Sequence, residues 1–234
     1  MIFSEYKYKI ELHSHTSPAS RCGRAAPDES VRLHKAEGYS GLVISNHLLP
    51  MDLENEGGIH EIIDRWYEDF SRAKEEGDRI GLSVILGAEL RFPQSGTDYL
   101  IYGIDRGDLY EILPHLATSF GEFRANWHSD HSLVIQAHPC RAGCVPAEPD
   151  LIDGVEAFNL HPSHNSHTAE CAAFARRVGK IVTAGSDFHK PWEIAMGGIR
   201  TKTLPRDSFE LAELLRSRDF LLDLGGIAAL PEIT

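Results

Sequence analysis

The sequence lacks several features that would point to a membrane, secreted or disulfide-stapled protein. No apolar run approaches the roughly 20 residues that a membrane-spanning helix needs. The first residues lack the basic start and apolar core of a signal peptide, so we expect a cytoplasmic protein. The chain has four cysteines in 234 residues, which do not resemble a disulfide framework.

Basic residues are also scarce. There are 23 Lys and Arg against 35 Asp and Glu, giving a formal net charge of -12. Proteins that wrap the nucleic-acid backbone usually show the opposite balance, so the composition argues against nucleic acid as a partner. A solvated surface explains most of this acidity, and some carboxylates can face bound cations instead.

Short apolar runs alternate with longer amphipathic segments along the chain. The apolar runs predict seven strands, at residues 8–13, 41–45, 83–86, 99–102, 133–137, 155–158 and 181–184. Helical spacing predicts helices at 27–38, 59–76 (closed by Gly77), 108–127 (broken near Pro114), 168–178 and 208–216. Apolar strands separated by helices are typical of a parallel sheet covered on its outer faces. We therefore predict one α/β domain over residues 1–234, closed or nearly closed into a barrel.

Residues of the types that bind metals follow five of the seven predicted strands. The motifs are His13-Ser14-His15, Ser45-Asn46-His47, Gly87-Ala88-Glu89, Ala137-His138-Pro139 and Gly185-Ser186-Asp187-Phe188-His189. Active sites of α/β barrels form at this carboxyl edge. Each motif alone can be explained as a turn or a helix cap without any function. A purely structural explanation would, however, have to account for all five strand ends at once. Seven donors exceed the needs of one catalytic ion, so the pattern predicts two or three ions that clamp a phosphoryl group and activate water.

In this order and spacing, the motifs resemble those of the PHP (polymerase and histidinol phosphatase) family of metal-dependent phosphoesterases, across nearly the whole chain. The resemblance implies a distorted (β/α)7 TIM-like barrel and two or three divalent metal ions, Zn, Mn or Fe. It assigns the ligands to three positions: His13, His15, Glu89 and Asp187 to the first metal, Glu89 and His138 to the second, and His47 and His189 to a third.

The sequence departs from the family pattern at three places. Trinuclear members often have another ligand, usually His, about six positions after the opening pair, where this chain has Arg21 with Cys22 beside it. Members also often have a His near the fourth strand, where this chain has Asp98-Tyr99, and Asp105 is a candidate replacement. Asn46 stands where an Asp is common, and it can hydrogen-bond a neighbouring ligand without adding charge.

Other residues are candidates for binding substrate. Arg21 and Arg141 are candidate phosphate binders, because guanidinium groups recognise phosphate in a bidentate manner. For Arg141, an ordinary surface arginine is an equal alternative. The histidines between His161 and His167 either shape the substrate mouth, donate a proton to the leaving group, or form a polar loop.

These observations predict a metal-dependent phosphoesterase that hydrolyses a small phosphomonoester or nucleotide with metal-activated water. No side chain is assigned as the nucleophile. One alternative is an amidohydrolase-type enzyme that cleaves a C-N or C-O bond. Such barrels usually bridge their metals with a modified lysine, and no lysine ends a predicted strand here. The other alternative is a regulatory barrel that binds metal or nucleotide without catalysis.

Overall fold

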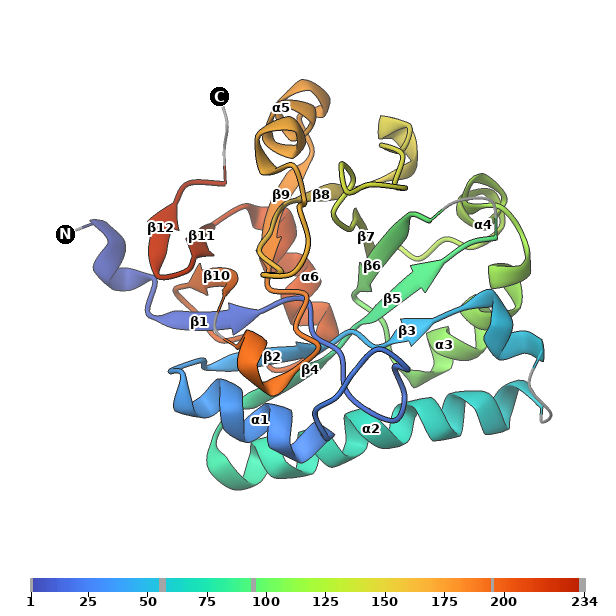
Figure 1. Ribbon diagram of the computed structural model, residues 1–234, viewed down its shortest axis with the longest axis horizontal. Helices are drawn as coiled ribbons and strands as arrows, with labels where there is room; N and C mark the ends of the chain where they lie inside the picture. Colours follow the sequence, from blue (N-terminus) through green and yellow to red (C-terminus); the bar gives the residue numbers. More distant parts are fainter. Residues whose placement is uncertain (1, 55–57, 94–95, 195, 232–234) are drawn as a thin grey trace.

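The chain folds into two six-stranded sheets with helices packed around them (Figure 1). The computed structural model describes residues 2–54, 58–93, 96–194 and 196–231. The first sheet has the order β12 (Ile227–Ala229), β11 (Phe220–Leu224), β10 (Gly197–Thr201), β1 (Tyr8–Glu11), β2 (Gly41–Ile44) and β4 (Ser83–Leu86). The second has the order β3 (His47–Leu48), β5 (Ala88–Arg91), β6 (Asp98–Tyr102), β7 (Leu133–Gln136), β8 (Gly154–Asn159) and β9 (Ile181–Gly185).

The α/β class is confirmed, but the described strands divide into two sheets instead of closing into one seven-stranded barrel. The sheets are linked at Gly87, the single residue between β4 and β5. A Cβ at Gly87 would lie 2.7 Å from Cγ1 of Val43, so only glycine fits this passage. The strand predicted at 83–86 is confirmed as β4, and β5 follows directly after the glycine as a strand that was not predicted.

The strand directions also differ from the predicted parallel sheet. β1, β2 and β4 are parallel to one another, as are β7, β8 and β9. In contrast, β6 is antiparallel to both β5 and β7, and β10 is antiparallel to β1. An apolar run carries no information on its direction. The reversal matters because it places Asp98, the first residue of β6, opposite Arg91 at the end of β5.

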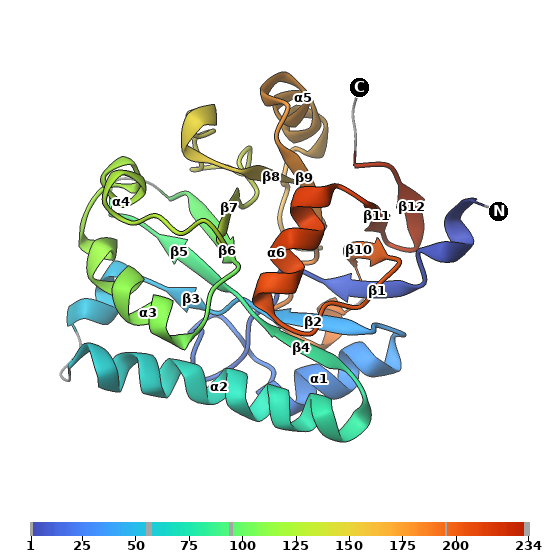
Figure 2. The same ribbon diagram turned by 180° about the vertical axis from the view of Figure 1, so that it is seen from behind.

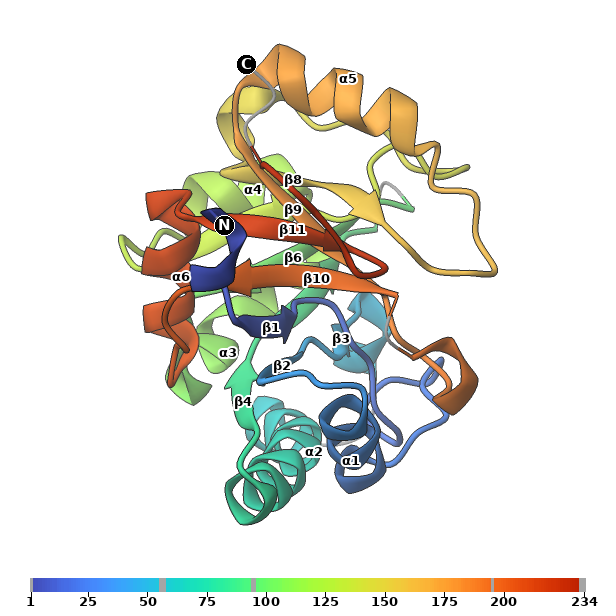
Figure 3. The ribbon, with the colours of Figure 1, turned by 90° about the vertical axis from the view of Figure 1, so that its left-hand side faces the viewer.

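Six α-helices lie in the described part of the chain: α1 (Pro27–Ala36), α2 (Ile59–Ile80), α3 (Arg106–Ile112), α4 (Phe120–Asn126), α5 (Thr168–Val178) and α6 (Ser208–Ser217). α1 packs along α2 beneath β2 and β4 in Figure 1. α6 lies on the opposite side, in front of the strands in Figure 2, and packs against β6. Figure 3 shows α6 at one end of the sheets and the loops after β1, β8 and β9 at the other.

The helix predictions hold with one correction. Helices at α1, α5 and α6 are confirmed, and the break near Pro114 is a 3-10 turn at Leu113–Ala117. However, α2 does not end at Gly77. It continues to Ile80 and ends at Gly81, which has the left-handed φ of 74° that glycine tolerates. Gly77 is instead a packing position, because a Cβ there would lie 2.5 Å from Cγ2 of Val84 in β4.

None of the described helices combines the length and apolar composition that crossing a bilayer requires.

Candidate metal centre

Four predicted ligands meet in a buried cluster where the loops after β1 and β9 reach β5. Nε2 of His13 lies 3.1 Å from Nε2 of His15. Both nitrogens lie 3.3 Å from Oδ1 of Asp187. The oxygens of Glu89 lie 3.3 Å from His13 and 3.2 Å from His15. Side chains as far apart in the sequence as His13 and Asp187, which are 174 positions apart, thus meet at one point.

The spacing of these four residues fits a divalent metal ion. Donor atoms held about 2.1 Å from one ion in a tetrahedron lie about 3.4 Å apart. His13 and His15 lie 3.1 Å from each other and 3.2 to 3.3 Å from the two carboxylates, and the ligand atoms of His13, His15 and Asp187 all lie within 4.8 Å of one another. Both oxygens of Glu89 are also buried without a hydrogen-bond partner. A buried carboxylate is costly unless cationic groups surround it, so the chemistry and the geometry both favour a cation here.

The electrostatics of the cluster are dominated by its carboxylates. Burial lowers the pKa of His13, but the charges of Glu156, Asp187 and Glu89 outweigh it and hold that pKa well above the usual range. Burial likewise raises the pKa of Asp187, but the neighbouring histidines outweigh it and hold that pKa well below its usual range. The cluster therefore concentrates negative charge inside the protein, which attracts a divalent cation.

Backbone contacts fix the direction of the opening histidine pair. Between the two histidines, the Ser14 hydroxyl donates to the carbonyl of Val43 at 2.6 Å, and its N–H donates to Oγ of Ser45 at 2.9 Å. Ser14 is thereby bound to β2, and His13 and His15 share the opposite direction. The side chain of Asn46 binds Thr16: its Oδ1 accepts from the backbone N–H of Thr16 at 2.7 Å, and its Nδ2 donates to the Thr16 hydroxyl at 2.8 Å.

Glu156 in β8 is a site residue that the sequence did not reveal. Its Oε1 accepts a hydrogen bond from Nδ1 of His13 at 2.9 Å, which leaves Nε2 free to face the cluster. Its Oε2 accepts from the backbone N–H of His138 at 3.2 Å and from Nδ2 of Asn159 at 2.9 Å. Glu156 therefore orients one predicted ligand and anchors another. The available signal was a charged residue inside the apolar run 155–158.

Glu11 in β1 has a similar supporting position. It accepts hydrogen bonds from the backbone N–H of His13 at 3.0 Å and of Ser186 at 2.9 Å. It thus ties the strand before His13 to the loop that carries Asp187. Burial raises the pKa of Glu11 to about 7, although the hydrogen bonds from Ser186 oppose this shift.

A second group of donors surrounds the other side of Glu89. Nε2 of His138 lies 3.4 Å from Oε1 of Glu89 and 3.8 Å from Oδ2 of Asp98. Arg91 donates to both oxygens of Asp98 at 2.6 Å. Asp98 also groups with His47 and Glu89, with ligand atoms within 4.8 Å of one another. Asp98 therefore lies among the predicted ligands of this second group.

The proposed replacement Asp105 is not part of the site. It is exposed and forms the N-terminal cap of α3, where its Oδ1 accepts from the backbone N–H groups of Gly107 and Asp108. In the predicted parallel sheet, the residues after β6 would lie at the site. Because β6 runs the other way, its start lies there instead.

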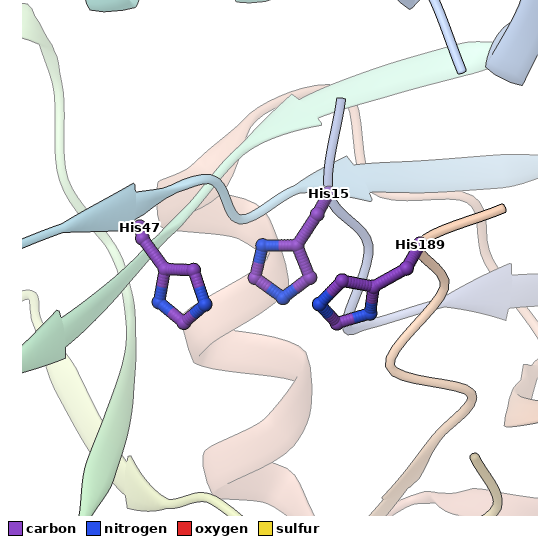
Figure 4. Close-up of side chains that lie close together, drawn as sticks. All are labelled: His15, His47 and His189. Atoms are coloured by element: carbon purple, nitrogen blue, oxygen red, sulfur yellow. The ribbon is translucent and has the colours of Figure 1, made fainter. Parts of the chain in front are cut away.

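The third group contains the rings of His15, His47 and His189. Figure 4 shows the ring of His15 between the other two, with centroids 4.5 Å from each. Nδ1 of His189 donates to the carbonyl of Asp187 at 2.7 Å, which directs its other nitrogen away from that loop. Burial raises the pKa of the Cys22 thiol, but the hydrogen bonds from His189 and His47 outweigh it and lower that pKa to about 5.

The two candidate phosphate binders occupy different environments. Arg21 is exposed and lines a surface pocket with Arg65 and Trp66. Arg141 donates from Nη2 to Oδ2 of Asp187 at 2.7 Å and to Oδ1 of Asn159 at 2.8 Å. Its Nε is buried without a partner. Arg141 therefore belongs to the site, where it holds Asp187 in place.

In the loop between His161 and His167, one histidine reaches the centre. The ring of His161 is buried, 5.3 Å from that of His189, and its Nε2 lies 3.4 Å from Oε2 of Glu193. His164 and His167 are exposed. Burial lowers the pKa of His161 to about 4, so the ring is neutral near pH 7. Because a neutral imidazole is a poor proton donor, His161 is better suited to shaping the substrate mouth than to protonating the leaving group.

Two predicted ligands have unusual backbone conformations. His138 has a φ of 31° and Asp187 a φ of 52°, both in the left-handed region that side chains other than glycine rarely adopt. Each such residue costs on the order of 1 to 3 kcal/mol and persists only where its surroundings enforce it. Strain at these two positions supports a functional constraint on this edge of the sheets.

Comparison with known proteins relates the fold to metal-dependent hydrolases. Neither a search of family models nor a search of curated proteins gave a match. Among solved structures, the chain is similar to a two-domain protein from Bacteroides vulgatus that contains a predicted PHP-like metal-dependent phosphoesterase (TM-score 0.61, 15% identity). The similarity covers 94% of this chain and 66% of that one, just under two thirds of its length.

Two further structures show the same relationship. A predicted metal-dependent phosphoesterase from Bifidobacterium adolescentis has a TM-score of 0.54 and 15% identity, over 89% of this chain and 96% of that one. An amidohydrolase from Chromobacterium violaceum, solved with bound sulfate and no metal, has a TM-score of 0.51 and 16% identity, over 93% of this chain and 98% of that one. At these identities the likeness concerns the fold alone. The chain thus shares its fold with PHP-like phosphoesterases and with an amidohydrolase.

Proposed function

We propose that the protein is a metal-dependent phosphoesterase that hydrolyses a small phosphomonoester or nucleotide. The observation that carries the proposal is the convergence of His13, His15, Glu89 and Asp187 at separations that fit one ion, around a carboxylate without hydrogen-bond partners. We take residues 1–234 as one domain, since the predicted ligands extend from His13 to His189.

Two overlapping sets of residues would hold two metal ions. His13, His15, Glu89 and Asp187 would hold the first ion, and Glu89, His138 and Asp98 the second. When bound, two divalent cations, Zn, Mn or Fe, supply Lewis acidity, an activated water and stabilisation of the leaving oxygen. Glu89 would contribute to both positions, because its oxygens face ligands of the first and of the second.

Other side chains orient the site and its substrate. Glu156 keeps the proton of His13 on Nδ1, and Arg141 binds the oxygen of Asp187 that faces away from the histidines. The guanidinium of Arg141 is partly exposed beside Asp187, so it can donate to a substrate phosphoryl oxygen. A net charge of -12 disfavours a polymeric nucleic acid, so a small phosphorylated molecule is the proposed substrate.

The first experiment measures hydrolysis of an aryl phosphate by the metal-loaded protein. His13→Ala and Asp187→Ala should each lower the rate by more than about 100-fold, because loss of a direct ligand exceeds the 10- to 100-fold cost of losing a supporting partner. His128→Ala, at an exposed histidine paired with Asp130, is the matched control and should retain activity. Unchanged activity in both site variants, or a folded protein that binds no metal, would contradict the proposal.

The similarity to an amidohydrolase keeps a second function open. The same metal sites can hydrolyse a C-N or C-O bond by polarising a carbonyl oxygen. A screen of the metal-loaded protein across phosphomonoesters, phosphodiesters, nucleotides, cyclic amides and esters separates the two classes. Metal binding without turnover of any of these would favour the regulatory alternative.

A further inference from the structure

The two ring nitrogens of His138 meet different partners. Nε2 faces the second group of donors, 3.4 Å from Oε1 of Glu89. Nδ1 lies 3.7 Å from Sγ of Cys144, and the same sulfur lies 3.5 Å from the carbonyl oxygen of Gly96. Within the part of the chain that the structure describes, Cys144 is the one hydrogen-bond partner of this nitrogen. A thiol thus contacts the ring on the side that faces away from the carboxylate.

The two contacts of the sulfur fix the direction of its hydrogen bonds. The Gly96 carbonyl can only accept, so the Cys144 S–H donates to it and the sulfur lone pairs are left to accept. Nδ1 of His138 therefore donates to the sulfur and carries the single proton of the neutral ring. Nε2 is then unprotonated and faces the carboxylates of Glu89 and Asp98, 3.4 and 3.8 Å away. With the opposite direction, the proton would lie on Nε2, which could then not bind a metal ion.

The loop after β7 holds Cys144 beside the ring of His138. The N–H of Arg141 donates to the carbonyl of His138 at 3.0 Å, and the N–H of Cys144 donates to the carbonyl of Arg141 at 2.9 Å. These two turns bring the chain back to its start. The next N–H, that of Val145, donates to Oγ1 of Thr97 at 3.1 Å, which joins the loop to the segment before β6. The position of the sulfur is therefore set by the backbone.

We propose that Cys144 is a positioning residue for the second metal position. Its sulfur accepts the Nδ1 proton of His138, which keeps Nε2 available to the ion that Glu89 and Asp98 would also bind. The inference rests on the proposed function in taking His138 as a metal ligand. Supporting partners of ligand histidines typically contribute about 10- to 100-fold to metal affinity. Because sulfur is a weak acceptor, we expect an effect near the lower of these values.

The first test measures zinc affinity of the whole chain by competition with a chelating dye. Cys144→Ala removes the acceptor and should weaken one zinc-binding step about tenfold. Cys144→Ser keeps both a donor and an acceptor at this position, so it should bind zinc more tightly than Cys144→Ala. Val145→Ala, at the exposed side chain next in the loop, is the matched control and should bind like the unchanged protein. Equal losses in Cys144→Ser and Cys144→Ala would indicate packing alone and overturn the hydrogen-bonding role.

The second test observes the Nδ1 proton of His138 by NMR of zinc-loaded protein with isotope-labelled histidines. We expect a proton signal on this nitrogen that is absent in His138→Gln and that exchanges with water faster in Cys144→Ala than in Val145→Ala. A purely structural role for Cys144 would not change this exchange. Unchanged exchange or unchanged zinc affinity in Cys144→Ala would overturn the positioning role and leave the metal-dependent function standing. A folded protein that binds no zinc would overturn both.

Discussion

Nδ1 of His13 donates a hydrogen bond to Oε1 of Glu156 at 2.9 Å, while Nε2 of the same ring lies 3.3 Å from Asp187. The carboxylate thus fixes which nitrogen carries the proton and which is free to bind a cation. Carboxylate–histidine pairs of this kind tune metal sites and typically contribute 10- to 100-fold to metal affinity.

Glu156→Gln should lower metal affinity at the first site by about 10- to 100-fold. The amide would present an NH2 group either to Nδ1 of His13 or to the donors on His138 and Asn159. In the first case the proton of His13 moves to Nε2, which can then no longer bind metal. Competition with a chelating dye measures the affinity. Glu170→Gln, at an exposed carboxylate, is the control, and equal affinities in the two variants would contradict the assigned role.

Metal loading should raise the free energy of unfolding, and Glu89→Gln should remove most of that gain. A ligand at 100 times its Kd stabilises a protein by about 2.7 kcal/mol. Glu89 contacts both the first and the second cluster, so its loss weakens two positions together. Urea unfolding with zinc and with a chelator gives the two values. The exposed Glu213→Gln should behave like the unchanged protein, and a full metal-dependent gain in Glu89→Gln would refute the shared ligand.

Buried His34 should make the fold less stable below pH 6.5. Burial lowers the pKa of His34 to about 4, and its Nε2 has no hydrogen-bond partner. Between pH 6.5 and 4 the unfolded chain binds this proton and the folded chain does not, so stability rises with pH across that window. The full effect is on the order of 3 kcal/mol.

His34→Phe keeps an aromatic ring against Tyr39 and Phe188 and removes the titration. Its unfolding free energy, measured with chelator present, should lose this part of the slope between pH 6.5 and 4. The exposed His128→Phe should retain the slope. An identical pH profile in His34→Phe and the unchanged protein would show that His34 is not the group responsible.

Two Gly→Ala substitutions in helices should have opposite effects. Gly77→Ala puts a methyl group 2.5 Å from Val84 and 2.7 Å from the Leu82 carbonyl, so we expect destabilisation of about 1 to 3 kcal/mol. Gly121→Ala in α4 meets nothing within 4 Å and should stabilise by about 0.5 to 1 kcal/mol. Thermal unfolding of both variants measures the difference, and equal effects would contradict the close packing of α2 on β4.

Much of the site could be predicted from the sequence, because residue patterns show where strands end. His13, His15, Asp187 and His138 each follow an apolar run, and parallel strands bring such ends to one edge. Their convergence is therefore a consequence of order and direction alone. Glu89 also reaches this edge, although it lies within β5 and not after a strand.

The parts of the site that could not be predicted from the sequence depend on the direction of the strands and on contacts between residues of different strands. Asp98 became part of the site because β6 is antiparallel, which no apolar pattern encodes. Glu156 lies in the middle of β8, where only the position of His13 in the folded chain gives its charge a partner. Glycine often ends a helix, so the sequence predicts an end at Gly77, and only the close contact of this position with Val84 shows a different role.

The division of the strands into two sheets has a mechanical consequence. His13 follows a strand of the first sheet, whereas Glu89, His138 and Asp187 lie in or after strands of the second. An ion bound between them would act as a cross-link between the sheets, in the way that a disulfide joins distant segments. The same atoms that prepare the site for chemistry would therefore also couple the two sheets during unfolding.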